Sequence, residues 1–167
     1  DMPVAKSKDE IILLEKIQER FSRHVKLFIK LTDQDVPQAV FTYAAELLNR
    51  IKDKTPILTG RLKNSFHMVP PSSPQDPFDI YYDNQGNQFS GRLNVSTGPN
   101  EAVVDSNVPY MIIIEGGHSR KAPAGMIGVS LLEMLGKLEK DLTKLLGKNW
   151  KKALEQTMPG YRLGTGK

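Results

Sequence analysis

The sequence has no cysteine and no long apolar run. Without cysteine, its 167 residues cannot supply disulfides, thiolate metal sites or thiol nucleophiles. No stretch approaches the roughly 20 apolar residues that a membrane-spanning helix needs, and residues 1–10 show no signal-peptide pattern. We therefore expect a protein that is soluble and cytoplasmic at synthesis and has no membrane partner.

The excess of one charge sign is small. The 23 Lys and Arg residues exceed the 19 Asp and Glu residues by four. This net positive charge is compatible with a nucleic acid that passes by the protein or with an acidic partner surface, and it identifies neither. Much of the excess lies near the end of the sequence, at Lys148, Lys151, Lys152, Arg162 and Lys167. A solvated basic tail explains this cluster better than a specific binding patch. A small nucleic-acid-binding protein remains the alternative from another functional class.

Residues that could carry chemistry are few and scattered. The three histidines, His24, His67 and His118, lie far apart, and we expect them at the surface or in turns. The spacing between Glu115 and His118 matches no standard metal-ligand motif. We therefore expect no metal site and no cofactor.

The serines and the glycine-rich end give no stronger sign of an enzyme. In residues 160–167, the first glycine lies one position farther from the Gly-Lys pair than it does in a phosphate-binding loop. Three serines lack the local arrangement of an activated nucleophile: Ser65, Ser119 and Ser130. We expect a non-enzyme, with a small enzyme of dispersed site, such as a nuclease, as an alternative.

Hydrophobic periodicity predicts two helices in the first third of the chain. Residues 8–31 carry an apolar stripe that must dock on the chain's own core or on a neighbouring subunit. We expect a break at residues 32–34. Asp35 as N-cap and Pro37 in the first turn then predict a second helix, which runs to about residue 53.

A third helix is predicted near the end of the chain. Leucines at helical spacing follow Val129, and Gly147 is the expected C-cap. Residues 148–167 are then expected to form a basic, flexible tail.

The middle of the chain reads as extended segments and turns. Residues 83–87 form a predicted hairpin turn. Strands or extended segments are expected at residues 61–69, 78–82, 88–97, 102–105 and 110–115, the last buried or at an interface.

A proline-rich segment lies between these strands. Residues 68–92 are expected to include an exposed loop or projecting arm, so that removing residues 70–77 leaves the fold intact. The candidate assembly contacts on this arm are Pro70, Pro71, Pro74, Pro77 and Phe78.

Together these elements predict an α+β fold. N-terminal helices and a C-terminal helix would pack on a small, mostly antiparallel β-sheet that carries an extended loop or hairpin arm. We find no internal repeat or linker and expect a single domain over residues 1–167. Within it, residues 8–31 form an N-terminal extension, residues 35–146 the core and residues 148–167 the tail.

Two short motifs occur in a fixed order. After a helix that ends near Pro56, the chain has Thr59-Gly60-x-Leu62-x-x-Ser65, and after the predicted strands it has Tyr110-x-x-x-x-Glu115-x-Gly117. Pro123 then falls in a loop before the last helix. Over residues 35–146 this order resembles the tail-completion (neck, head–tail joining) minor tail protein family of long-tailed bacteriophages, related to lambda-like protein Z. The segment 68–92 is longer than in that family, and many members lack the first helix.

The resemblance implies a structural protein of the virion neck. It implies a homo-oligomeric ring, a hexamer, that joins the tail tube to the head and lets genomic DNA pass without sequence specificity. Its neighbours would be the connector, the tail terminator or the tail tube. The protein would lie at the head–tail interface of the virion, and in the host cytoplasm during assembly. A tail-terminator or head-completion (connector) subunit remains an alternative.

The signature residues also have simple physical interpretations. Gly60 permits a tight turn directly after a helix-ending proline. Gly117 permits a sharp exit from the Ile run or close approach of a neighbour, with an ordinary turn glycine equally plausible. Glu115 is expected to pair with a base on its own chain or on a neighbour.

Overall fold

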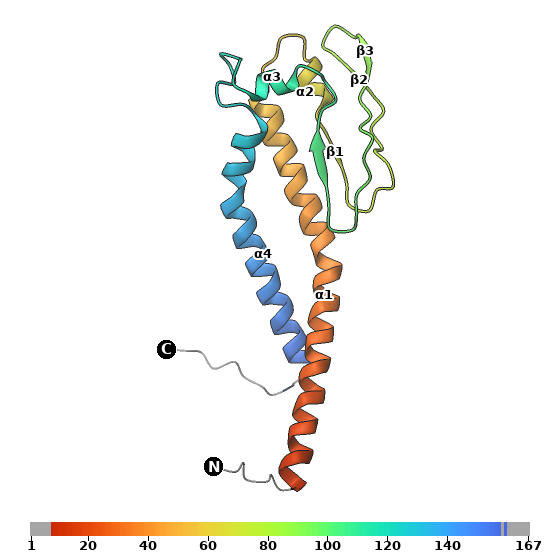
Figure 1. Ribbon diagram of the computed structural model, residues 1–167, viewed down its shortest axis with the longest axis vertical. Coiled ribbons are helices and arrows are strands. Elements are labelled where there is room, and N and C mark those ends of the chain that lie inside the picture. The colour runs from red at the N-terminus through yellow and green to blue at the C-terminus, as the bar shows by residue number, and fades with distance from the viewer. Residues whose placement is uncertain (1–7, 158, 160–167) are drawn as a thin grey trace, which may run out of the picture. The chain divides into compact units, whose positions relative to one another are not determined.

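The computed structural model describes residues 8–157 and residue 159, and these residues divide between two compact units (Figure 1). Among the described residues, the helical unit contains residues 8–35, 143–157 and 159, and the core unit contains residues 36–142. Two long helices, α1 (Lys8–Lys54) and α4 (Ile127–Thr157), each contribute a segment to both units. None of the described helices has a stretch long and apolar enough to span a bilayer.

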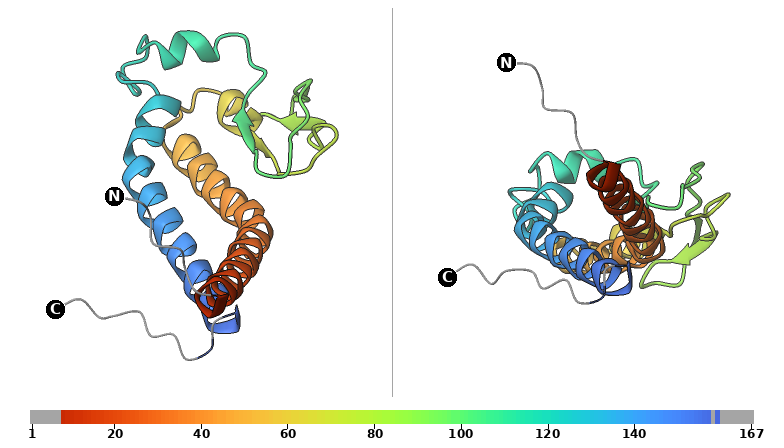
Figure 2. Two further views of the ribbon diagram at one scale, coloured as in Figure 1. Left: turned by 60° about the horizontal axis from the view of Figure 1, so that its bottom comes forward. Right: turned by 90° about the horizontal axis from the view of Figure 1, so that it is seen from below.

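The core unit combines helices with two small antiparallel sheets. Between α1 and α4 the order is α2 (Arg61–Ser65), β1 (His67–Val69), β2 (Ile80–Tyr82), β3 (Gln88–Ser90), β4 (Val103–Asp105) and α3 (Met111–Glu115). Strand β1 pairs with β4, with Met68 opposite Val104, and β2 pairs with β3, with Tyr81 opposite Phe89. Figure 2 shows α3 leading from the β region to the start of α4. The predicted α+β class is confirmed.

The core of this unit draws on α1, α2 and β2 and on the segments that follow α2 and that precede α3 and α4. Its buried cluster consists of Ile51, Leu62, Phe66, Tyr81, Val108, Ala122 and Met126. Phe66, Ile51 and Met126 are fully buried. Burying one side chain of this size contributes roughly 1.5–3 kcal/mol, so short elements such as α2 are held mainly by packing.

The predicted break in the first helix was wrong. Helix α1 continues through residues 32–34, Asp35 is not an N-cap, and Pro37 lies inside the helix. A proline in a helix removes one intrahelical hydrogen bond. Because Val36, Pro37 and Val40 are all partly buried, packing offsets that loss. The boundary between the two units follows Asp35.

Two segments predicted to be extended are short helices instead. Residues 61–65 form α2, and only residues 67–69 of the predicted segment 61–69 are a strand. The Ile run forms α3, not the predicted strand at 110–115. A turn from the Val108 carbonyl to the Met111 N–H begins this helix, and Gly117 ends it. End-capping and packing outweigh the β preference of isoleucine here.

Helix α4 continues past the predicted cap at Gly147. It ends at Thr157, so residues 148–157 are helical where a flexible tail was expected. Apart from Pro159, the rest of that tail lies outside the described residues. Within the core unit α4 buries Ser130 and Met134, whereas Leu132 and Leu135 of the predicted stripe are 71% and 48% exposed.

The helical unit is held by an aromatic cluster. The His24 ring lies edge-on to Trp150 with 4.1 Å between ring centroids, and Phe28 contacts the same indole at 5.2 Å. Asn149 and Ala153, which are close to Trp150 in the sequence of α4, are also buried. Much of the predicted apolar stripe stays exposed, because Ile17, Phe21 and Ile29 are each more than half accessible.

The predicted hairpin turn is confirmed. Oδ1 of Asp83 accepts hydrogen bonds from the N–H groups of Gln85 and Asn87, both at 2.9 Å, and Oδ2 accepts one from the Asn87 side chain. These bonds close the turn between β2 and β3. The Asn87 side-chain bond is the main cause that lowers the pKa of Asp83.

The proline-rich segment is anchored by a buried hydrogen bond between His67 and Asp76, so it is not a free arm. Asp76 is 1% exposed, and its Oδ2 lies 2.6 Å from Nε2 of His67. The other ring nitrogen of His67 lies 2.9 Å from the Ser65 carbonyl oxygen, so each ring nitrogen faces an oxygen atom. His67 also stacks on Phe78 at 4.0 Å. The buried positions of His24 and His67 contradict the expectation of surface or turn residues.

The Asp76 carboxylate is stabilised in its ionised form. Burial alone would raise the pKa of Asp76, but hydrogen bonds from the N–H groups of Leu93 and Phe78 and from His67 outweigh it and lower the pKa. Deleting residues 70–77 would remove this carboxylate and leave His67 buried without its partner. We therefore expect that deletion to unfold the β region, contrary to the interpretation from sequence.

Asp76→Asn tests this anchor. We expect the free energy of unfolding at pH 7 to fall by about 3 kcal/mol, because a buried pair loses one partner. The folded-state pKa of Asp76 is depressed, so its contribution is present above the unfolded-state value near 3.8 and disappears as pH falls through the folded-state pKa. Urea unfolding from pH 7 to pH 3 should show the gap between variant and parent closing in acid.

Asp79→Asn is the matched control. Asp79 is exposed and forms a 3.4 Å ion pair with Arg92, so its removal should change stability by less than about 0.5 kcal/mol. An Asp76→Asn variant as stable as this control at pH 7 would show that the buried pair does not anchor the segment.

Candidate docking site

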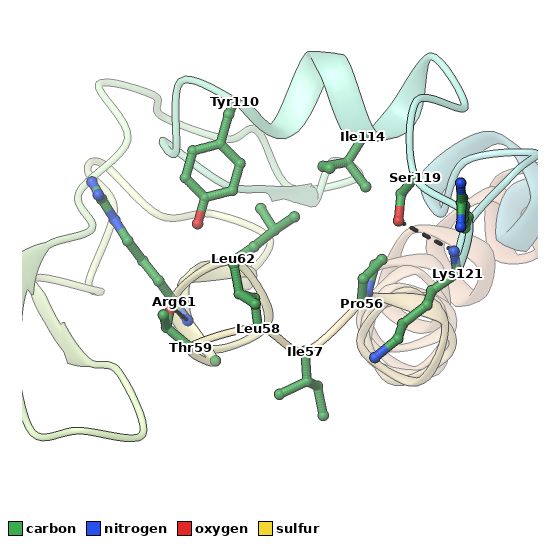
Figure 3. Close-up of a pocket in the computed structure, with 12 residues that line it drawn as sticks. Pro56, Ile57, Leu58, Thr59, Arg61, Leu62, Tyr110, Ile114, Ser119 and Lys121 are labelled. Carbon is green, nitrogen blue, oxygen red and sulfur yellow. Dashed lines mark hydrogen bonds between the residues drawn. The ribbon is translucent and has the colours of Figure 1, made fainter.

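The core unit contains an apolar pocket of about 520 Å³. Two chain segments, 56–62 and 110–121, contribute all of its walls. The lining residues are Pro56, Ile57, Leu58, Thr59, Gly60, Arg61, Leu62, Tyr110, Ile114, Ser119, Arg120 and Lys121. Figure 3 shows Tyr110 and Ile114 of the α3 segment above Leu62 and Leu58.

The first wall forms where α1 ends and α2 begins. Gly60 has φ +78°, a left-handed backbone conformation that costs conformational energy for residues other than glycine. The hairpin turn between β2 and β3 fixes this segment, because the Asn84 N–H donates a hydrogen bond to the Thr59 carbonyl at 2.8 Å. Leu62 then points into the core, while Leu58 stays 97% exposed at the pocket.

The second wall is α3 and the loop that follows it. The N–H of Gly117 bonds to the Ile114 carbonyl at 3.0 Å, and that of His118 bonds to the Ile113 carbonyl at 3.4 Å. With Gly117 at φ +83°, these bonds form a Schellman motif that ends the helix after five residues. A Cβ on Gly117 would lie 2.5 Å from the Pro123 carbonyl oxygen, so close packing also requires glycine here.

A pair of serines joins the two walls. The Ser65 hydroxyl donates to the Leu62 carbonyl at 2.7 Å, so the Ser106 hydroxyl donates to Ser65. The Val108 N–H in turn donates to the Ser106 oxygen at 3.1 Å. Both serines are buried. The end of the first motif is thereby bonded to the turn that begins α3.

Glu115 fixes the loop between α3 and α4. Its carboxylate accepts hydrogen bonds from the N–H groups of Met126, Ile127 and Gly128, at 2.8, 2.9 and 2.8 Å. These are N–H groups at the start of α4, which have no partner within the helix. Burial raises the pKa of Glu115, but the three N–H bonds outweigh burial and lower it. The expected pairing of Glu115 with a base is therefore replaced by a helix cap.

Cations lie at both ends of the apolar pocket. Figure 3 shows Arg61 at one end and Lys121 at the other. The Arg61 guanidinium lies 4.2 Å from the centre of the Phe89 ring, and Arg120 and Lys121 are exposed. Among the described residues, none of these three cations forms a salt bridge with a carboxylate.

The structure brings most of the predicted signature residues to this pocket. Five of them line it: Pro56, Thr59, Gly60, Leu62 and Tyr110. The other four, Ser65, Glu115, Gly117 and Pro123, hold its walls or the adjoining loop through the contacts above. The motifs identified from sequence therefore lie around one pocket.

The other predicted contacts lie elsewhere. Pro70, Pro71, Pro74, Pro77 and Phe78 do not line the pocket. Phe78 packs on the core cluster beside His67. Sequence reasoning did not select Ile57, Leu58, Arg120 and Lys121 as site residues, although an apolar pair directly after a helix-ending proline is a detectable signal of exposed hydrophobic surface.

Comparison with known families places the chain among bacteriophage tail components. The sequence model of the family described as "Bacteriophage HK97-gp10, putative tail-component" matches residues 15–117, more than half of the chain. The chain belongs to this family, and the class to which it belongs is that of structural virion proteins. The match covers both signature motifs and ends at Gly117. No curated protein and no solved structure gives a significant match.

Gly60→Val tests the turn that forms the first wall. We expect a loss of about 1–3 kcal/mol in unfolding free energy, because valine must adopt a left-handed φ and its Cβ would approach the Asn84 side chain to 2.3 Å. Chemical denaturation measures the change. Gly136→Val is the control, since Gly136 lies in α4 with open space around it, and it should stay within about 0.5 kcal/mol of the parent. Equal stability of the two variants would contradict the assigned strain.

Glu115→Gln tests the cap on α4. We expect a loss of about 1–2 kcal/mol at pH 7, because an ionised acceptor of three N–H groups becomes neutral. The folded-state pKa of Glu115 is lowered, so the loss should shrink as pH falls through that value. Urea unfolding, with hydrogen exchange at Ile127 and Gly128, gives the measurement. The control is Glu139→Gln, at an exposed position of α4, which should change neither the unfolding free energy nor the hydrogen exchange. An equal effect of both variants would contradict the assignment of Glu115 as a helix cap.

Proposed function

We propose that this tail-component family member is a subunit of the tail-completion ring in the virion neck. In this role it joins the tail tube to the head and forms part of the passage for DNA. The supporting observation is that both signature motifs of the tail-completion resemblance build one exposed apolar pocket. A pocket of this kind suits a protein whose function is contact with other proteins.

A closed ring requires each subunit to present two different, complementary faces. The chain has several exposed apolar surfaces that could serve. They include the pocket with Leu58, the Ile112–Ile113 pair of α3, and the outer face of the N-terminal part of α1. We propose a homo-hexamer, matching the symmetry of the tail, with a connector, tail terminator or tail tube as neighbours.

The charge of the chain is compatible with a DNA passage. Many lysine or arginine contacts to phosphate would hold the DNA in the ring, because each contact adds salt-dependent affinity. A net charge of +4 over 167 residues limits that retention. In this proposal the DNA passes without sequence-specific contacts.

Removing the protein from its phage tests the proposal. We expect electron micrographs of lysates to show DNA-filled heads and tails of normal length that are not joined, and plating should show at least a thousandfold loss of infectious titre. A plasmid copy of the parent sequence should restore joined particles.

Other outcomes would contradict this role. Normal infectious particles without the protein would show that it has no part in joining. Tails of abnormal length would indicate a tail terminator, and heads that leak DNA would indicate a head-completion subunit.

A further inference from the structure

The pocket face leaves apolar side chains uncovered in the described chain. Leu58 is 97% exposed and Ile57 is 49% exposed, both beside the pocket. An exposed apolar surface with a defined hollow is typical of a protein–protein contact. Its occupant should bring apolar side chains to the hollow and carboxylates to the cations around it.

The cations restrict the occupant further. Arg61 lies at one end of the hollow and Lys121 at the other (Figure 3), and Arg120 lines the pocket next to Lys121. An apolar occupant with an acidic residue on each side of its apolar pair would match this arrangement in charge as well as in polarity.

One segment of the chain has this pattern. Residues 9–15 of α1 read Asp-Glu-Ile-Ile-Leu-Leu-Glu, with three acidic residues, and Lys8 and Lys16 flank this segment. Ile12 is 42% exposed and Leu13 is 59% exposed. Asp9 and Glu15 are exposed on either side of this pair in sequence. Because Asp9, Ile12 and Leu13 are three and four residues apart, they share one face of the helix, and Glu15, three residues after Ile12, lies at the edge of that face.

We propose that the pocket of one copy receives this segment, residues 9–15 of α1, from the next copy of the same chain. Ile12 and Leu13 fill the apolar hollow, and Asp9 and Glu15 meet Arg61, Arg120 and Lys121. An amphipathic helix in an apolar groove is a common mode of recognition. The contact is head to tail, since the two faces differ, and repeating it closes a ring. This inference rests on the proposed ring and identifies its interface.

Cysteine cross-linking tests the contact in assembled particles. The chain has no cysteine of its own, so Leu13→Cys and Leu58→Cys introduce the only thiols. The double variant, supplied from a plasmid to phage that lacks the gene, should give a ladder of disulfide-linked oligomers on a non-reducing gel of purified particles. Each single variant should give no ladder. Leu13→Cys with Ile80→Cys is the matched control, because Ile80 is 46% exposed but lies on β2 and does not line the pocket.

Every other result has a definite meaning. Particles that contain the chain without cross-links would overturn the inference and leave the proposed function intact. A bridge within one chain, or a bridge from Leu58→Cys to a different virion protein, would assign another occupant and also overturn it. Particles that never contain the chain would overturn the proposed function itself.

Charge exchange provides a second, independent test. Arg120→Glu with Lys121→Glu should lower infectious titre about tenfold or more, because like charges then face each other across the contact. Adding Asp9→Lys and Glu15→Lys to the same chain should restore the titre. Lys140→Glu with Lys144→Glu, at exposed positions of α4, should have no effect. Failure of the second pair to rescue the first, in chains that fold normally, would contradict the pairing.

Discussion

The Glu115 carboxylate joins the pocket region to the start of α4. A partly buried carboxylate must be satisfied by hydrogen bonds, and three N–H groups from residues 126–128 satisfy this one. The same contact gives α4 its starting point and fixes the ends of the loop that carries Arg120 and Lys121. One side chain therefore connects the end of α3, the rim of the pocket and the first turn of a long helix.

Other polar contacts work in the same way, by joining segments that are distant in sequence. Ser65 and Ser106 connect the two signature motifs, and His67 and Asp76 hold the proline-rich segment against the β region. All four side chains are buried. Removing one member of such a pair leaves the other without a partner, which costs more than an apolar replacement of both. These contacts hold short helices and strands that would not be stable alone.

The pocket links the structure to the family to which the chain belongs. Residues that were recognised by their order in the sequence prove to line one hollow or to hold its walls. A tail component must bind other proteins through a defined surface, and this hollow is lined by the signature residues themselves. In the proposed ring, the exposed segment 9–15 of α1 is the surface that this hollow receives. A subunit with two such faces can form a closed assembly.

Much of the fold followed from the sequence, because local patterns decide local structure. Helical periodicity predicted α4 and most of α1, Asp83 and Gly86 predicted the hairpin turn, and ordered motifs indicated the phage tail family. Only the tertiary structure decided the course of α1 through Pro37 and the helical form of the Ile run, because packing and capping overrode residue preference. The role of Glu115 was also invisible in the sequence, since its partners are backbone N–H groups brought near by folding. The sequence indicated the signature residues, and only the tertiary structure showed that they meet at one pocket and that Ile57, Leu58, Arg120 and Lys121 complete its lining, because folding brings two distant segments together.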